Sequence, residues 1–248
     1  MEKINKVAQI SLLFWLMKIV ATTLGETLGD YLSMTLDLGY LTGIFITLIF
    51  FLAVLSVQLL AKKYVPLFYW LVIIATTTLG TEISDFMDRS LHLGYTMGSV
   101  VLFGGLLLSL LLWYKKFKSL SVFPIFDRNQ EIYYWIAILF SNSLGTAFGD
   151  YLSDEIGLSY LNGALFTAGI ILIVVLLHYF SKINHIILFW IAFIFTRPFG
   201  ATFGDFLTKP IVKGGLDLGT LNASIVSIAI MTIMILFSHQ SLKNNLLK

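Results

Sequence analysis

Long apolar runs separated by short polar breaks are the feature that most restricts the fold of this chain. A helix that crosses the roughly 30 Å hydrocarbon layer of a bilayer needs about 20 mostly apolar residues. Charged side chains make up only 12% of the sequence, against roughly 25% in soluble domains. We predict an all-α integral membrane protein with no soluble domain and eight transmembrane helices, over residues 10–31, 40–60, 67–86, 94–113, 132–151, 160–180, 186–206 and 220–237.

Four segments in register indicate that the chain is built from repeats. They read LGETLGDYLS, LGTEISDFMD, LGTAFGDYLS and FGATFGDFLT, and their first glycines are 55, 65 and 55 residues apart. A tryptophan stands ten residues before each of these glycines. We predict a single transmembrane domain, 1–248, of four two-helix units at about 7–61, 62–117, 127–181 and 182–240, paired into halves 1–120 and 121–248.

Each unit holds an even number of predicted spans, so all four units enter the membrane in the same direction. The repeats are therefore parallel, unlike the inverted repeats of many secondary transporters. Segments such as DLGYLTG and HLGYTMG open the second helix of each unit. In the fourth unit this segment comes about four residues late, because of an insertion around 209–215.

Charge placement predicts the orientation of the chain. If the N-terminus and the breaks after the even-numbered spans share one side, that side holds eleven of the 16 basic residues: Lys3, Lys6, Lys62, Lys63, Lys115, Lys116, Lys118, Arg128, Lys182, Lys243 and Lys248. By the positive-inside rule, both termini are cytoplasmic. Eleven of the 14 acidic residues lie towards the outer side, where they either attract cations or are simply tolerated.

Small residues four apart mark the first helix of each unit as a close-packing helix. The pairs are Gly25 and Gly29, Gly80 and Ser84, Gly145 and Gly149, and Gly200 and Gly204. We therefore expect the odd-numbered helices to form the inner bundle. The even-numbered helices are richer in large aliphatic and aromatic residues, which favours packing outside, towards lipid.

An aspartate follows the second small residue of every unit, at Asp30, Asp85, Asp150 and Asp205. With the preceding tryptophan near the inner interface, the fifteen residues to the aspartate cover about 22 Å. All four aspartates then lie at similar depth, within the outer third of the hydrocarbon layer. An ionisable group at such a depth is costly, which favours a role for it.

We interpret the four aspartates as a ring of cation ligands, with Glu26 and Glu82 as auxiliary ligands. Glu26 and Asp30 are four residues apart and face one side of a helix. Oxygen-only ligands suit hard divalent cations such as Mg²⁺, Ca²⁺ or Mn²⁺. Such an ion is expected as substrate, and no cofactor is implied. Alternatively, each aspartate bonds a helix end or a hydroxyl of its own unit, such as Tyr40, Tyr95 or Tyr160, and only locks the fold.

Two basic residues inside odd-numbered spans are candidates for charge compensation. Lys18 lies two turns before Glu26, and Arg197 lies two turns before Asp205. They either neutralise part of the acidic cluster until a cation displaces them, or are permanent ion-pair partners.

Other functional classes lack support in the sequence. The chain has no cysteine, and its four histidines are scattered. Nucleophile motifs, phosphate-binding loops and nucleotide signatures are absent, so we expect neither an enzyme nor a nucleic-acid partner. The expected partners are the lipid bilayer and a small cation.

The repeated G-x-x-x-G-D pattern on eight predicted spans resembles a family of bacterial proteins described only as uncharacterised membrane-anchored proteins. The resemblance covers nearly the whole chain and implies a multi-pass protein of the bacterial plasma (inner) membrane. The segment ETLGD, residues 26–30, is also similar to the E-x-G-D motif of membrane Ca²⁺/Mn²⁺ exchangers. It has one extra residue between the acids and lacks the following base and hydroxyl.

The leading hypothesis is transport or permeation of a hard cation, with Mn²⁺ as an example, through the intramembrane carboxylates. The alternative is a non-transporting membrane scaffold or regulatory protein in which the repeated aspartates lock the helix packing.

Overall fold

Helices account for nearly all of the described chain, which in this computed structural model covers residues 5–246, with side chains to residue 240. The predicted all-α fold is confirmed. The predicted ends agree with the observed helices to within four residues, except at the end of the last helix. The helices are α1 (Leu12–Asp30), α2 (Tyr40–Leu60), α3 (Pro66–Asp85), α4 (Gly94–Phe117), α5 (Arg128–Asp150), α6 (Tyr160–Phe180), α7 (His185–Thr208) and α8 (Thr220–Leu246).

Seven of these helices are long and apolar enough to cross a membrane, which is typical of an integral membrane protein. The exception among the described helices is α5. It begins with the polar sequence RNQE and carries Ser-Asn-Ser at 141–143. The prediction of a span over 132–151 is therefore not supported by composition alone.

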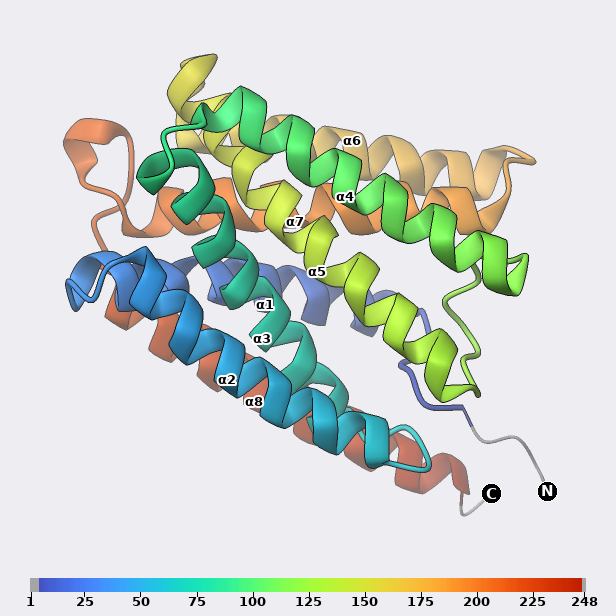
Figure 1. Ribbon diagram of the computed structural model, residues 1–248. Helices are drawn as coiled ribbons and strands as arrows, with labels where there is room; N and C mark the ends of the chain where they lie inside the picture. The colour runs from blue at the N-terminus through green and yellow to red at the C-terminus, as the bar shows by residue number, and fades with distance from the viewer. Residues whose placement is uncertain (1–4, 247–248) are drawn as a thin grey trace.

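The odd-numbered helices form a closed inner ring in which α1 and α5 each pack against both α3 and α7. The even-numbered helices pack outside, each mainly on the odd helix of the following unit: α2 on α3, α4 on α5, α6 on α7, and α8 back on α1. Figure 1 shows all odd helices running in one direction and all even helices in the other. Within the apolar stretches, 61% to 78% of residues are buried in α1, α3 and α7, against 22% to 28% in the outer helices.

The first glycine of each motif makes the ring contacts possible. A Cβ added at Gly25 of α1 would collide with Thr77 of α3, and one at Gly200 of α7 would collide with Thr22 of α1. Gly80 and Gly145 meet the next odd helix in the same way, at Asn142 and Arg197 respectively. The close approach that small residues permit therefore recurs four times and closes the ring.

A widened, π-helical turn follows the aspartate in the first three units. The N–H of Leu36, for example, donates to the carbonyl of Tyr31, five residues earlier, at 2.8 Å. In the fourth unit the equivalent bond joins Leu216 N–H to the Phe206 carbonyl at 2.7 Å, so the insertion loops out between them. Each chain reversal then contains at least one residue with positive φ: Asp37 and Gly39 in the first unit, His92 and Gly94 in the second, Gly157 in the third, and Gly214, Asp217 and Gly219 in the fourth.

At the opposite end of the bundle, the segment before α1 is held against the ends of other helices. Lys6 forms a buried ion pair with Glu131 at the start of α5. Gln58 of α2 donates to Glu131 Oε1 at 2.8 Å and to the Lys6 carbonyl at 3.0 Å. Of the basic residues used to predict orientation, Lys3, Lys243 and Lys248 have side chains outside the described residues.

Candidate carboxylate site

Each helix of the inner ring carries one buried aspartate at or near its C-terminal end. Asp30, Asp85 and Asp150 are the last residues of α1, α3 and α5, and Asp205 lies three residues before the end of α7. Asp85 and Asp150 share a single base. Arg89 Nη2 lies 3.2 Å from Asp150 Oδ2, and its Nη1 lies 3.7 Å from Asp85 Oδ2. The same guanidinium donates to the Tyr40 hydroxyl at 3.0 Å and to the Tyr95 hydroxyl at 3.2 Å. These tyrosines therefore bind the base, whereas the locking hypothesis paired them with aspartates of their own units.

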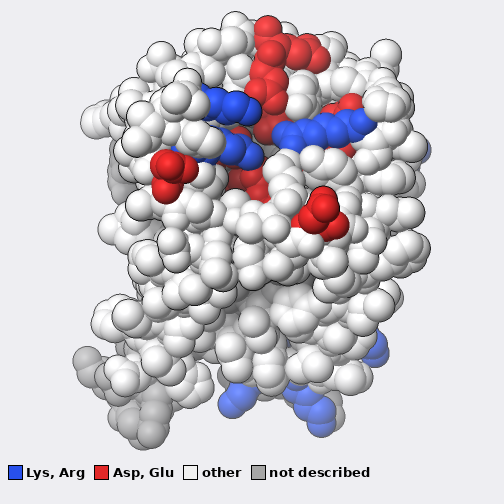
Figure 2. Space-filling model, turned by 90° about the vertical axis from the view of Figure 1, so that its left-hand side faces the viewer, with Lys and Arg blue, Asp and Glu red and all other residues white. Residues whose placement is uncertain are grey.

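Lys209 forms ion pairs with the other two aspartates in the same way. Its Nζ lies 2.7 Å from Asp30 Oδ2 and 3.1 Å from Asp205 Oδ1. Burial alone would lower the pKa of Lys209, but the carboxylates of Asp205 and Asp30 outweigh it and raise this pKa well above its ordinary value. Figure 2 looks onto this end of the molecule, where acidic side chains are visible at depth between basic ones. Both bases thus join aspartates of neighbouring units.

A second charged layer lies deeper, around Arg197 of α7. This side chain is fully buried, and its Nη2 donates to Glu26 Oε2 at 2.9 Å, to Thr81 Oγ1 at 2.6 Å and to Thr146 Oγ1 at 2.5 Å. Glu26, Thr81 and Thr146 each directly follow the first glycine of their motif. Arg197 was predicted to compensate charge, and the acid it meets is Glu26, with no ion pair to Asp205.

Lys18 of α1 lies deeper still and has no carboxylate within ion-pair distance among the described residues. Its Nζ donates to Asn142 Oδ1 at 2.9 Å and lies 3.9 Å from the ring centroid of Phe193. Asn142 in turn donates to Thr76 Oγ1 at 3.0 Å. The polar interior therefore continues from the aspartates to Lys18.

Aromatic side chains close the ring below Lys18. The hydroxyls of Tyr69 and Tyr134 bond each other, and both residues are fully buried. Trp70 packs edge-on against Tyr69, and Trp135 packs edge-on against Tyr134. Phe14 contacts Trp70 with ring centroids 5.6 Å apart. The charged interior is thus closed towards the end that carries Lys6 and Glu131.

Three carboxylates converge closely enough to hold one metal ion. Glu26, Asp30 and Asp205 each offer an oxygen, and these oxygens lie within 4.8 Å of one another. Oxygen ligands of this kind suit hard divalent cations. In the described arrangement Arg197 pairs with Glu26, and Lys209 pairs with both Asp30 and Asp205, so two bases face three acids. Asp85 and Asp150, at the same level, are not part of the group, so the predicted ring of four is divided into two unequal halves.

Glu82 lies apart from this cluster, although we predicted it as an auxiliary ligand. A Cβ added at Gly43 of α2 would lie 2.5 Å from the Glu82 carboxyl carbon, so the carboxyl group rests on α2. Thr81, one residue earlier, faces the ring interior. Because successive helical residues are rotated by about 100°, Glu82 is turned away from the centre.

Several residues of the site were not predicted from the sequence, although their positions in the repeat could have identified them. Arg89 and Lys209 each stand four residues after a motif aspartate, but they were not among the residues predicted to compensate its charge. Thr81 and Thr146 occupy the motif position of Glu26, and Asn142 occupies that of Arg197. Comparing the four units position by position would have placed these residues in the same layers.

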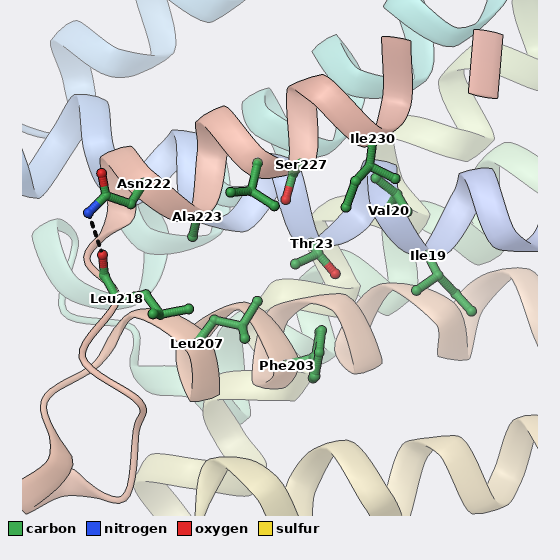
Figure 3. Close-up of a pocket in the computed structure, with 11 residues that line it drawn as sticks. Ile19, Val20, Thr23, Phe203, Leu207, Leu218, Asn222, Ala223, Ser227 and Ile230 are labelled. Atoms are coloured by element: carbon green, nitrogen blue, oxygen red, sulfur yellow. Dashed lines mark hydrogen bonds between the residues drawn. The ribbon is translucent and has the colours of Figure 1, made fainter. Parts of the chain in front are cut away.

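A cavity of about 270 Å³ lies elsewhere, between α1, α7 and α8. Figure 3 shows Ile19, Phe203 and Ile230 among its lining residues, with Asn222 bonded to the Leu218 carbonyl. Its lining contains no charged side chain. The cavity therefore offers an apolar surface and is separate from the carboxylates.

The fold and the site together define a protein of four related helix pairs that buries ionisable side chains inside a closed helical ring. The chain belongs to the family described as Repeat of Unknown Function (DUF347), whose repeat matches residues 13–64, 68–118, 133–184 and 188–243. This match confirms the predicted fourfold repeat and the resemblance to an uncharacterised family. Similarity to cation exchangers and bacterial origin stay predictions. Neither a curated protein nor a solved structure matches the chain.

Proposed function

We propose that this chain is an integral membrane protein of the bacterial inner membrane that crosses the bilayer eight times, has both termini in the cytoplasm, and transports a hard divalent cation such as Mn²⁺. The cation binds Glu26, Asp30 and Asp205. The observation that carries the proposal is the convergence of three buried carboxylates within 4.8 Å. A structural ion pair needs only one carboxylate for each base, whereas a divalent ion benefits from several oxygen ligands.

The bases in the cluster fit a site that exchanges its occupant. Lys209 Nζ lies between two of the three carboxylates, at distances of 2.7 and 3.1 Å. Its side chain is 22% exposed and belongs to the loop-bearing end of α7. An arriving cation therefore takes the place of Lys209, and the lysine side chain swings outward. The carboxylates stay paired throughout the exchange, because unpaired buried charges would be costly.

The aromatic layer explains why this arrangement is not an open channel. Beneath Lys18, the hydrogen-bonded pair Tyr69 and Tyr134 and the packed tryptophans fill the ring. We infer that a cation enters from the outer end or leaves through it, and that passage to the other side needs a rearrangement of the inner ring. This is the alternating opening expected of a transporter.

Matched substitutions in the two groups of motif aspartates, inside and outside the three-carboxylate group, test the site. Asp30→Asn removes a ligand of the three-carboxylate group, whereas Asp150→Asn removes an aspartate at the same level outside it. We expect Asp30→Asn to weaken Mn²⁺ binding by tenfold or more, which is about 1.4 kcal/mol, and to reduce Mn²⁺ uptake into proteoliposomes. Asp150→Asn should change affinity much less. Equal affinity of both variants and the wild type would reject the site.

The alternative function is a non-transporting scaffold or regulator. The observation in its favour is that every motif aspartate already has a base of the same chain nearby, and that each base joins two units. In this case the substitutions at Asp30 and Asp150 should lower the thermal stability of the protein to a similar extent. Wild-type proteoliposomes would then take up no more Mn²⁺ than empty ones.

A further inference from the structure

Glu82 is a buried acid that the proposed cation site does not use. Its side chain is 0% exposed, and neither carboxylate oxygen has a hydrogen-bond partner among the described residues. By contrast, Glu26 and the four motif aspartates all lie within 4 Å of a basic nitrogen. Asp88 is also buried and has no base within 4 Å, but it accepts a hydrogen bond from Ser84 Oγ at 3.3 Å. Among the buried acids of the described residues, Glu82 is therefore the one with neither a base nor a hydrogen-bond partner.

The same motif position in the other units shows what is unusual about Glu82. In the first unit it is Thr27, whose hydroxyl bonds Ser224 of α8 at 2.9 Å. In the third unit it is Ala147, and in the fourth it is Thr202, which bonds the Pro198 carbonyl of its own helix at 2.9 Å. Only the second unit places an acid between an inner and an outer helix, against Gly43.

The surroundings of Glu82 favour a bound proton. An ionised carboxylate in a buried, apolar interface without a partner costs several kcal/mol, and such a group takes up a proton instead. From α1, the charges of Asp30 and Glu26 act on Glu82. From α5, Asp150 is held by Arg89. On α2 the only titratable side chain is Tyr40, and α8 has none before His239.

We propose that Glu82 is a proton-binding site separate from the carboxylate cluster, and that a divalent cation bound at the cluster releases this proton. The second part rests on the proposed function. Negative charge on Asp30 and Glu26 makes the neutral form of Glu82 more favourable, because like charges repel. A divalent cation adds positive charge beside those acids and reduces that repulsion. The affinity of Glu82 for a proton then falls, and the coupling is reciprocal, so cation and proton exchange.

Carbodiimide labelling tests the proton site without requiring transport. Dicyclohexylcarbodiimide is apolar and adds to a protonated carboxyl group to give a stable adduct, with the acid proton retained in the product. In folded wild-type protein we expect the adduct on Glu82, detected by peptide mass spectrometry, and less of it as the pH rises. Glu82→Gln should lack it while keeping the elution volume of the wild type. Absence of an adduct on Glu82 from mildly acidic to neutral pH would overturn the site.

Proton release tests the coupling. Addition of Mn²⁺ to weakly buffered wild-type protein should release acid, read with a pH-sensitive dye, and should reduce labelling of Glu82. Glu82→Gln should bind Mn²⁺ but release at least several-fold less acid. Equal release from both proteins would overturn the coupling. If the wild type bound no Mn²⁺, the cation site itself would fail, while labelling of Glu82 would still decide whether the proton site exists.

Discussion

Lys209 and Arg89 occupy equivalent motif positions, yet their surroundings differ by one carboxylate. Lys209 neutralises Asp30 and Asp205, with Glu26 beside them, whereas Arg89 joins two aspartates and two tyrosine hydroxyls. Because Arg197 pairs with Glu26, this half has three acids and two bases, and the other half has two acids and one base, so each carries one more acid than bases. The half that contains Glu26 differs in that three carboxylate oxygens converge within 4.8 Å, close enough to coordinate one divalent ion.

Neutralising Lys209 should strengthen cation binding. Lys209→Gln removes the group that competes for Asp30 and Asp205, so we expect Mn²⁺ affinity to rise by about tenfold, or about 1.4 kcal/mol. Without metal the variant should melt at a lower temperature, because two buried carboxylates lose their partner, and Mn²⁺ should restore the loss. Arg89→Gln is the control: it should also be destabilised, with little recovery on adding Mn²⁺. Equal recovery of both variants would contradict the assignment.

The pKa of Lys209 predicts how this effect depends on pH. Because the raised pKa lies above the ordinary value of about 10.4 for lysine, the stabilisation is fully present below that ordinary value. It is lost only as the pH rises through the raised one. The difference in melting temperature between wild type and Lys209→Gln should therefore stay constant between about pH 7 and about pH 9. A difference that disappears within this interval would show that Lys209 is not held as a cation.

The sequence was sufficient to predict the buried aspartates, but not the basic residues that pair with them. The aspartates could be found because the motif repeats them beside small residues that must face another helix. The ion pairs could not, because they join units through turns whose path depends on the widened helical turn and on the insertion after Asp205. Glu82 was predicted to lie beside Glu26 as an auxiliary ligand. It stands one residue after the motif position of Glu26, and one residue along a helix rotates a side chain by about 100°, so it faces another direction.

At the scale of helices, the close approach of neighbouring inner helices depends on the first glycine of each motif. Gly25→Ala should destabilise the protein by about 1–3 kcal/mol, because the added methyl group overlaps Thr77 in a packed interface. Gly169→Ala in α6 is the control, since a Cβ there meets nothing within 4 Å. Thermal unfolding in detergent should separate the two variants. Equal stability would mean that the α1–α3 contact can widen at little cost.

The helix boundaries followed from hydropathy, but the pairing of helices did not. A repeat of two helices reads as a self-contained hairpin, whereas in the structure each outer helix packs mainly on the inner helix of the next unit. Periodicity cannot distinguish these arrangements, because both bury the same face of each helix. The preference comes from contacts between units, such as Glu82 on Gly43 and Thr202 on Gly163.

At the scale of the whole molecule, the contact between α7 and α1 closes the inner ring, and α8 packs back on α1 outside it, so all four units share one interior. The odd helices of the ring point the same way. If the other helices cross the membrane as we propose, this shared direction requires α5 to cross it too, despite its polar composition. If α5 did not cross, the later units would enter the membrane inverted. The orientation of α5 is therefore the strictest test of the arrangement.

Single cysteines can report that orientation, because the chain has no cysteine of its own. Asn129→Cys lies in the first turn of α5 and Ile156→Cys lies after the end of this helix, both at exposed positions and neither at a basic residue that sets topology. In intact cells, a membrane-impermeant maleimide should label Ile156→Cys and leave Asn129→Cys unlabelled until the membrane is opened. Val212→Cys, on the insertion and 94% exposed, is the positive control for the outer side. Labelling of both test positions from the same side would show that α5 does not span, and the closed ring of parallel units would have to be abandoned.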